Sequence, residues 1–584
     1  MSSVYFNGEM ITIPGAYSSI DVSQMGTKRD DSATKLIAII GEADGGEPET
    51  LQLFSDPVSA KKVLKSGELL VACNKAWNPV TSSKAGVAVG GANVIAAIRT
   101  NRATKGSVDI NDGQLVIESQ DWNADVNQIA VKMADGTNGS KTMVVYDQKN
   151  DVYETFSNIG GLFSLKYTGD QDYAAVSITK DKDTKEVRLI TKIGADASSA
   201  VEDINILLSQ MDAEIIKSMR ALISILKSYE NYSVSVVSNY VSSTKVSEID
   251  PIADVDIKTS AANITSFYAN ISSKLKVASN LVQVKSYDDS KGAVDAFDYK
   301  YLTGGSDGTT LASWVKYFDM LSNYNVTYIV PLTGDAAIQA ELFSHVQTQS
   351  GTKGKERRMI VGGEIGETVA DTIARANSFA NARAQVVHGG FYDYDDDGEL
   401  VLYAPYMLAA QHAGRCANLD DGESATHDVY KMAMPEYKLS TSEVTQLIEA
   451  GCLAFEFVLD SSTISSSFVR LVQDITTDIS STSSVYTERA TGVLADSINM
   501  EIREKCDEIL TGKRTSTSDL TTVKNAVLTI LYNRKNVKDQ ILDYKDVYVS
   551  KSGTTTTINY SVAPAEVNNF TLITAHYYSE DLSV

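Results

Sequence analysis

Two groups of continuous apolar strands, separated by a long stretch of different character, constrain the fold of this chain most. Uninterrupted apolar strands are typical of parallel sheets that helices cover on both faces. The first group falls within residues 31–104 and the second within residues 300–435, so we expect one α/β core built from two distant parts of the chain. The strand candidates are 36–40, 94–98, 326–330 and 358–361.

Helix signals accompany these strands. Asp56 followed by Pro57 predicts a helix start, because proline is tolerated in the first helical turn. Ser440 and Glu443 have the spacing of a capping box, and Gly451 stands where a helix C-terminal glycine belongs. The expected helices span 57–64, 68–77, 311–323, 335–347, 404–416 and 444–450.

The stretch between the two strand groups predicts two consecutive insertions. Residues 105–200 alternate in short runs broken by Asn, Asp and Gly turns, which indicates an inserted β-sandwich-like domain. Residues 201–299 are mixed, because apolar spacing over 204–226 predicts a helix and alternation over 233–237 predicts a strand. We interpret this second part as an inserted α/β domain.

A C-terminal α/β domain is expected over residues 436–568, with helices at 490–510 and 521–534. Strands are expected at 452–459 and 469–476. The predicted fold class is therefore a multidomain α+β and α/β protein, with an α/β core, two inserted domains, a C-terminal domain and an extended arm at each end.

Both ends of the chain predict extended arms. Residues 1–30 lack a helical period, and about 25 extended residues span roughly 80 Å, enough to reach a neighbouring molecule. Residues 569–584 read as a final strand with apolar residues on both faces, which needs cover from another molecule. The N-terminal arm residues are Ile11, Ile13, Pro14, Tyr17, Ile20 and Val22, and the C-terminal arm residues are Phe570, Leu572, Ile573, Ala575 and Tyr577.

Charge and composition exclude several classes of partner. The net charge of −23 argues against a nucleic-acid partner held by phosphate contacts and against adsorption to an anionic membrane. No segment is apolar for long enough to predict a transmembrane helix, and residues 1–10 lack the features of a signal peptide. The four cysteines contain no CxxC pair and fit synthesis in a reducing cytoplasm.

Motifs that look chemical have simpler interpretations. Residues 393–398 match half of a calcium loop but lack the closing glutamate, so an acidic hairpin tip is expected. The glycine turn at 41–46 carries two acids and no Lys-Ser/Thr, so a strand-to-helix turn is expected instead of a phosphate loop. The glycine-rich segment 304–308 is expected to lead into the 311–323 helix. No histidine pair has zinc spacing, and the sequence predicts no catalytic residue, metal or cofactor.

Several segments in a fixed order carry a family resemblance. They are the Pro14-Gly15-Ala16-Tyr17 arm, the glycine turn from Gly41 to Pro48, the run 53–78, the strand 90–99, the 302–308 loop, the 469–477 and 495–513 segments, and the last strand. Their order resembles the contractile tail sheath proteins of bacteriophages and related injection machines. The resemblance is weakest over 105–299.

The resemblance implies a structural protein and not an enzyme. It implies copies that stack as hexameric rings around a tail tube, joined by arms that add strands to neighbouring subunits. The implied partners are other copies, the tail tube protein, and the baseplate and tail terminator proteins. The implied location is the virion tail, after synthesis in the host cytoplasm, and the implied activity is contraction that drives the tube through the host envelope.

A basic cluster on the expected 490–510 helix has two interpretations. It is either a solvated face with i,i+4 charge pairs or a surface that docks on the tube. The candidate tube-facing residues are Arg489, Arg503, Lys505, Lys513 and Arg514.

Alternative functions stay open from the sequence. A sheath of a headless contractile injection system or bacteriocin would have the same features. A secreted carbohydrate-active or glycan-binding protein is a more remote alternative. A third alternative is that the β insertion binds host glycans on the sheath surface, although few aromatic residues cluster in its sequence and Trp122 is its only tryptophan.

Overall fold

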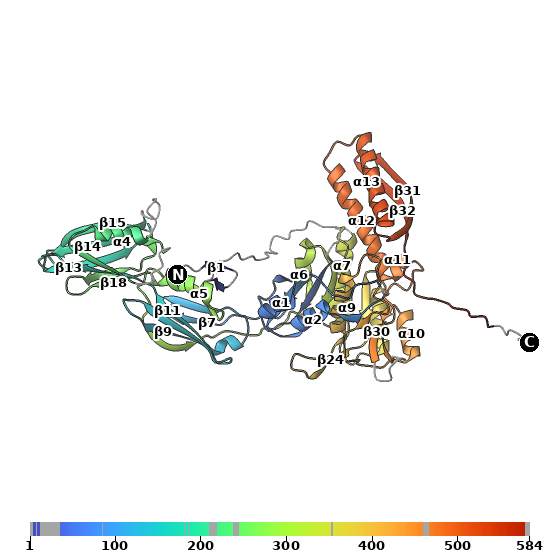
Figure 1. Cartoon of the computed structure of the whole chain (residues 1–584), viewed down its shortest axis with the longest axis horizontal. Helices are drawn as coiled ribbons and strands as arrows, with labels where there is room; N and C mark the ends of the chain where they lie inside the picture. The colour runs from blue at the N-terminus through green and yellow to red at the C-terminus, as the bar shows by residue number, and fades with distance from the viewer. Residues whose placement is uncertain are drawn as a thin grey trace, which may run out of the picture.

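The structure is a computed structural model, elongated, with the insertions at one end, the core near the other and the C-terminal helices standing above the core (Figure 1). Among the described residues, no helix is long and apolar enough to cross a membrane. The structure describes residues 4–6, 9–11, 35–84, 86–181, 183–184, 186–209, 219–237, 244–351, 354–459 and 467–577.

A seven-stranded sheet forms the core and joins three distant parts of the chain. Neighbouring strands of this sheet are parallel, except that β4 (Leu51–Phe54) pairs antiparallel with β6 (Ile95–Arg99) at one edge. The expected strands at 36–40, 94–98, 326–330 and 358–361 all lie in it, which confirms the interrupted α/β core. The strand order is β28 (Cys452–Leu453), β23 (Ala384–Val387), β22 (Arg358–Gly362), β21 (Val326–Pro331), β3 (Leu36–Gly41), β6 (Ile95–Arg99) and β4 (Leu51–Phe54).

Helices cover both faces of this sheet, and each face has its own apolar cluster. The first face carries α1 (Pro57–Leu64), α2 (Glu68–Trp77) and α9 (Pro405–Asn418). The second face carries α6 (Val315–Met320), η3 (Leu321–Asn323), α7 (Ala336–Gly351), α8 (Val369–Phe379) and α10 (Thr441–Glu449). The predicted starts are confirmed: Asp56 caps α1, and Ser440 and Glu443 form a capping box at α10.

Two small antiparallel sheets flank the core. The acidic segment 393–398 is a hairpin tip, as expected, because β24 pairs with β25 on either side of it. The first sheet holds β29 (Phe455–Leu459), β30 (Ser467–Leu471), β26 (Val429–Tyr430) and β5 (Val80–Ser82). The second holds β25 (Leu400–Tyr403), β24 (Phe391–Tyr394) and β27 (Met434–Pro435).

The two insertions are nested, not consecutive. An inner insertion, 107–159 with 267–301, has one apolar cluster, and an outer insertion, 161–265, has another. The inner insertion contains β7 (Ser107–Ile110), β8 (Leu115–Ser119), η1 (Asp125–Gln128), β9 (Ile129–Asp135), β10 (Lys141–Asp147), β11 (Val152–Ile159), α5 (Phe267–Ala278), β19 (Val282–Tyr287) and β20 (Phe297–Tyr301). The outer insertion contains β12 (Gly161–Tyr167), β13 (Tyr173–Lys180), β14 (Val187–Gly194), β15 (Val201–Leu207), α4 (Met219–Lys227), β16 (Tyr232–Val236), η2 (Val246–Glu248), β17 (Ile252–Asp256) and β18 (Ala262–Thr265).

This nesting corrects the expected boundary at residue 200. The boundary would cut the outer insertion through its four-stranded sheet, in which β15 pairs with β14. The helix expected over 204–226 is likewise wrong at its start, because Ile204 lies in β15; among the described residues of this stretch, helix is found at 208–209 and in α4. Its helical spacing was misleading, since strand pairing with β14 decides the conformation.

The chain crosses between core and inner insertion twice, side by side. Bridges join Thr104 to Ser306 and Ser107 to Thr303. Gly308 has a φ of +68°, and a Cβ there would lie 2.2 Å from the backbone of Arg102, so this close approach requires glycine. Residues 304–308 therefore form one of the two segments that connect the core to the inner insertion.

The glycine turn at 41–46 leads into β4, so the expected strand-to-helix turn is wrong.

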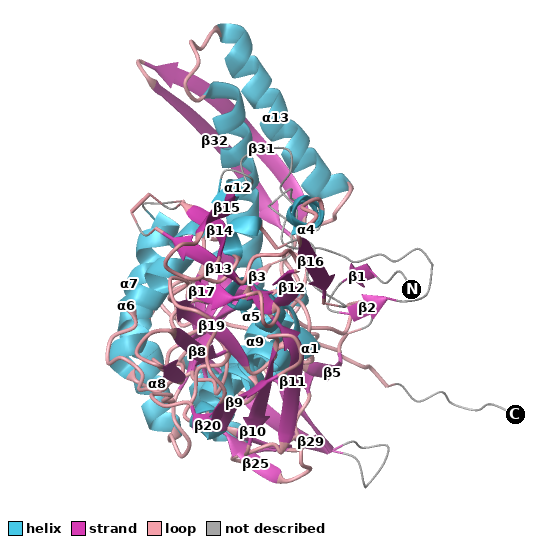
Figure 2. Ribbon diagram, turned by 90° about the vertical axis from the view of Figure 1, so that its left-hand side faces the viewer, coloured by secondary structure: helices cyan, strands magenta, loops and turns pink. Residues whose placement is uncertain are grey.

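The C-terminal part forms a separate layer above the core. A long helix, α12, leaves the core and packs with α13 against a β-hairpin (Figures 1 and 2). The expected start at residue 436 is too early, because β28 completes the core sheet and residues up to Val493 belong to the core cluster. Its elements are α11 (Ser484–Thr487), α12 (Arg489–Leu510), α13 (Thr517–Asn536), β31 (Ile541–Ser552) and β32 (Thr555–Pro564).

Candidate intersubunit surfaces

The C-terminal tail is fixed at its root. Ser484 of α11 donates a 2.7 Å hydrogen bond to Glu566, and Asn569 donates to Glu488 at the start of α12. Burial raises the pKa of Glu488, while the bond from Asn569 lowers it. The tail therefore leaves the molecule from a defined point between α11 and α12.

Among the described residues, the tail segment 570–577 pairs with no strand and is open to solvent. Its large apolar side chains are 81–96% exposed, and it runs away from the body of the molecule (Figure 1). Contiguous apolar exposure of this kind marks an interaction surface. All five predicted C-terminal arm residues lie on it: Phe570, Leu572, Ile573, Ala575 and Tyr577.

The hairpin β31–β32 has free edges among the described residues, because each strand pairs only with the other. Its inner face packs on α12 and α13 through Ile541 and Val547. Figure 2 shows the hairpin and α13 standing clear of the rest of the molecule. An unprotected strand edge is a template for pairing with another chain. Neither strand of this hairpin was predicted from the sequence, although alternating residues on both sides of a Ser552-Gly553 turn are a hairpin signal.

A groove of about 410 Å³ runs between α12 and β32. Apolar side chains dominate its walls, and Asn499 and Tyr560 add polar groups that hydrogen-bond each other. Pro564, the last residue of β32, also lines it. Further lining residues are Leu494, Ala495, Ile498, Ile558 and Val562.

The N-terminal arm is described only in part. Val4–Phe6 (β1) and Glu9–Ile11 (β2) pair antiparallel, with Val4 opposite Ile11, so this segment is a hairpin and not a fully extended arm. The remaining predicted arm residues lie outside the described residues: Ile13, Pro14, Tyr17, Ile20 and Val22.

The predicted tube-facing residues do not form one surface. Arg489 is fully buried, so it is not available for docking, and its assignment is wrong. Arg503 pairs with Glu356 of the core, and Lys505 forms a 2.6 Å pair with Glu508 of its own helix. Lys513 and Arg514 are exposed just after α12.

Arg489 belongs to a buried polar network beneath α9. Its Nη2 lies 2.7 Å from Asp474, and both side chains are fully buried. Burial alone raises the pKa of Asp474, but the charge of Arg489 and bonds from His412 outweigh it and hold that pKa well below its usual range. Burial lowers the pKa of His412, whereas Cys416 and Asp474 raise it to about 9.

Three members of this network have metal-ligand chemistry. One ligand atom each from His412, Cys416 and Asp474 lie within 4.8 Å of one another. Both Asp474 oxygens, however, accept hydrogen bonds, from Arg489, Gln385 and the Ala425 amide. A metal ion would have to displace these donors and sit beside a guanidinium, so the residues fit an ion-pair network and not a metal site.

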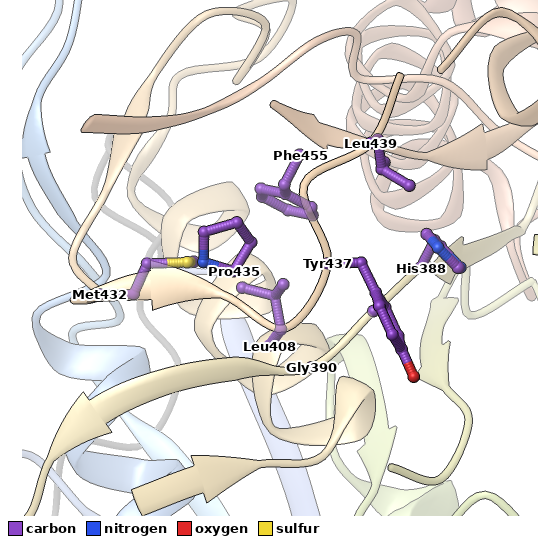
Figure 3. A pocket seen from close by; sticks show the side chains of 9 residues that line it. His388, Gly390, Leu408, Met432, Pro435, Tyr437, Leu439 and Phe455 are labelled. Carbon is purple, nitrogen blue, oxygen red and sulfur yellow. The ribbon is translucent and has the colours of Figure 1, made fainter. Parts of the chain in front are cut away.

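A small hollow beside His388 does not resemble an active site (Figure 3). Its volume of about 10 Å³ is at the limit for one water molecule. His388 Nδ1 lies 2.8 Å from the Thr372 hydroxyl, and the rings of His388 and Tyr437 are stacked at 6.4 Å. Burial lowers the pKa of His388 to about 4. Thr372 is fully buried, so a substrate cannot reach this pair.

Three phage proteins match the chain over nearly its whole length. It is 28% identical over 568 residues to the putative tail sheath protein of Enterococcus phage phiEF24C. It is 29% identical over 580 residues to the tail sheath protein of Bacillus phage SP01, and 28% over 590 residues to that of Staphylococcus phage Twort. Each match covers 97–98% of this chain and 96–97% of the relative. Over nearly its whole length the chain is therefore similar to phage tail sheath proteins.

Two crystal structures of sheath tail proteins are similar in fold to this chain. That from Desulfitobacterium hafniense has a TM-score of 0.52 at 12% identity and covers 94% of this chain and 100% of its own. That from Listeria innocua has the same TM-score and identity, over 91% and 92%. No protein-family model matches the chain. The relatives are structural proteins, and the resemblance drawn from the ordered segments is confirmed.

Proposed function

We propose that this chain is the subunit of a contractile tail sheath. In this proposal, copies stack as hexameric rings around a tail tube in the virion, between baseplate and tail terminator, and contraction drives the tube through the host envelope. The observation that carries the proposal is the end-to-end match to three phage tail sheath proteins. The exposed tail and the open hairpin edge supply a means of joining copies.

The tail of one copy is proposed to pair with the β32 edge of another. A strand added at this edge would lie over α12, and alternate side chains would enter the groove between α12 and β32. Each backbone hydrogen bond adds about 0.5–1.5 kcal/mol net, and each large apolar side chain that becomes buried adds about 1.5–3 kcal/mol. A ring of such joints would hold neighbouring copies firmly.

Contraction is proposed to move subunits as nearly rigid bodies. The arms act as hinges, because residues 570–577 make no strand contact within the described part of their own subunit that would restrain them. The contracted lattice would lie lower in free energy by burying more surface between copies, so the sheath would need no nucleotide. The chain would then assemble in a metastable extended lattice that a baseplate signal releases.

A cysteine crosslink tests the joint directly. Ile573→Cys combined with Asn559→Cys places one thiol on the tail and one in the groove, and oxidation should give a ladder of covalent oligomers. Ile573→Cys with Val58→Cys is the matched control, because Val58 is 79% exposed but lies on α1 of the core. A ladder in the control alone, or in neither protein, would refute the proposed joint.

Truncation and imaging test the larger proposal. We expect full-length protein to form regular tubes by negative-stain electron microscopy, alone or with a tail tube protein as template. Removal of residues 569–584 should leave folded protein that does not polymerise. Normal tubes from the truncated protein would contradict the arm mechanism, whereas no tubes from full-length protein on the tube template would contradict the sheath function.

A further inference from the structure

Four tyrosines gather on the outer face of one sheet of the inner insertion. This sheet has the order β11, β10, β9, β20. Its register places Tyr153 opposite Tyr146, Tyr146 opposite Ala130, and Ala130 opposite Tyr301. One row of side chains therefore crosses all four strands, over roughly 14 Å. We call the set Tyr146, Tyr153, Tyr299 and Tyr301 the tyrosine face.

Three rings of this face contact one another in series, from Tyr153 through Tyr146 to Tyr299. Tyr146 and Tyr153 are stacked, with centroids 4.2 Å apart and planes at 17°, and Tyr299 meets Tyr146 edge-on at 6.3 Å. Ala130 between them is fully buried, so the rings close over it. Tyr153, Tyr299 and Tyr301 are nevertheless 42–57% exposed. The apolar cluster of the inner insertion lies on the opposite side of the sheet and does not use these rings.

One lysine and two carboxylates surround the tyrosine face. Lys132 lies 5.3 Å from the Tyr299 ring centroid and forms a 2.8 Å ion pair with Asp298. Asp151 adds a further negative charge and accepts a 3.4 Å hydrogen bond from the Tyr146 hydroxyl. An anionic ligand would face these two carboxylates on a chain of net charge −23. The site therefore suits an uncharged ligand.

We propose that the tyrosine face binds a neutral saccharide. Pyranose rings have an apolar C–H face that stacks on aromatic rings and a rim of hydroxyls that hydrogen-bond to phenols and carboxylates. The row offers both, with ring faces along its length and Tyr hydroxyls, Asp151 and Asp298 beside them. Its length across four strands suits a short oligosaccharide better than a single sugar.

The shape of the face favours this ligand over a second protein. A stable protein interface buries about 800 Å² on each partner around an apolar centre. The tyrosine face is a single row of rings flanked by Lys132, Asp298 and Thr155, which are polar. The sheet lies at the end of the molecule away from the C-terminal tail and groove (Figure 1). Saccharide binding here is therefore independent of the proposed joints between copies.

Calorimetric titration of the full-length protein tests the proposal. The probes are the neutral hexasaccharides of N-acetylglucosamine and of glucose, with poly(glycerol phosphate) as the anionic comparison. We expect at least one hexasaccharide to saturate the protein and the polyanion not to bind. Tyr153→Ala and Tyr299→Ala should each weaken binding about fivefold, because each removes one stacking ring. Tyr153→Phe keeps the ring and should stay within about twofold.

Tyr394→Ala is the matched control, since Tyr394 is 63% exposed but lies on β24 of the core. It should leave the affinity unchanged. Failure of both hexasaccharides to saturate at about 10 mM, or equal affinity in the wild type, Tyr153→Ala and Tyr299→Ala proteins, would overturn the proposal. Loss of tube formation in Tyr153→Ala without saccharide binding would assign the face to contacts between copies instead.

Discussion

Asp474→Asn tests how far the core depends on one buried ion pair. The substitution keeps the shape of the side chain and removes its charge, while Arg489 stays fully buried. The guanidinium would retain only neutral partners, the Tyr328 hydroxyl at 2.9 Å and the Glu423 carbonyl at 2.7 Å. Breaking a buried pair by removing one partner costs about 3–5 kcal/mol, so we expect a loss of that size in the free energy of unfolding of the core.

Tryptophan fluorescence during guanidinium unfolding reports on the relevant part of the molecule. Trp77 and Trp314 both pack in the core, so Trp122→Phe in the inner insertion leaves only core signals. Glu508→Gln is the matched control, because it also removes one negative charge but from the exposed pair with Lys505. An exposed pair contributes at most about 1 kcal/mol, so the control should hardly move the transition.

A second variant separates charge from shape. Asp474→Leu combined with Arg489→Met removes both charges, and replacing a whole buried pair by apolar residues is often nearly neutral. We expect the double variant to regain most of the stability that Asp474→Asn loses. The reasoning fails if Asp474→Asn shifts the transition no more than Glu508→Gln, or if the double variant is less stable than the single one.

Three further outcomes are expected. Burial lowers the pKa of His345 and His388 to about 4. The unfolded chain therefore binds protons that the native state excludes, so the core should lose stability as the pH falls from 6.5 towards 4, by at most about 3 kcal/mol for each histidine. Unfolding of the His388→Gln variant with the same pH dependence as the wild type would contradict this. Gly414→Ala should lower the free energy of unfolding by about 1–3 kcal/mol or more, because the new Cβ would lie 2.0 Å from the Ala76 carbonyl oxygen and force α9 away from α2. Gly351→Ala is the control and should leave the stability unchanged, because a Cβ at that position meets open space. Arg534→Met removes the ion pairs with Asp421 and Glu501, so it should raise the rate of amide hydrogen exchange in α13 and β31 but not in the core sheet. Unchanged exchange rates would show that these ion pairs do not hold the C-terminal domain against the core.

Local signals in the sequence predicted the core well. The Asp56-Pro57 start, the Ser440 and Glu443 capping box, and Gly451 with a φ of +77° are all features that neighbouring residues determine by themselves. The apolar strands were equally clear because parallel strands are buried on both faces. These features depend on short-range chemistry, which a sequence displays directly.

The features that were missed depend on contacts between distant residues. Met133 of β9 pairs with Phe297 of β20, across the whole outer insertion, and no local pattern announces that pairing. Arg489 looks like a surface charge on a helix until Asp474 is placed beside it. The tyrosine face has the same origin, because its rings come from strands β10, β11 and β20 and become neighbours only in the folded sheet.

Helix α12 explains why a change of lattice would be expected to act at the arms and not within the subunit. Its first turns are part of the core cluster through Val493, and the next residues, from Leu494 onward, form the cluster under the hairpin. Arg503 pairs with Glu356 of the core, and Arg534 of α13 pairs with Asp421 of the core and Glu501 of α12. Bending the C-terminal domain against the core would have to break these pairs and open both clusters at once. The described tail residues 570–577 form no ion pair or apolar cluster with the rest of the described chain, so motion between copies would cost least there.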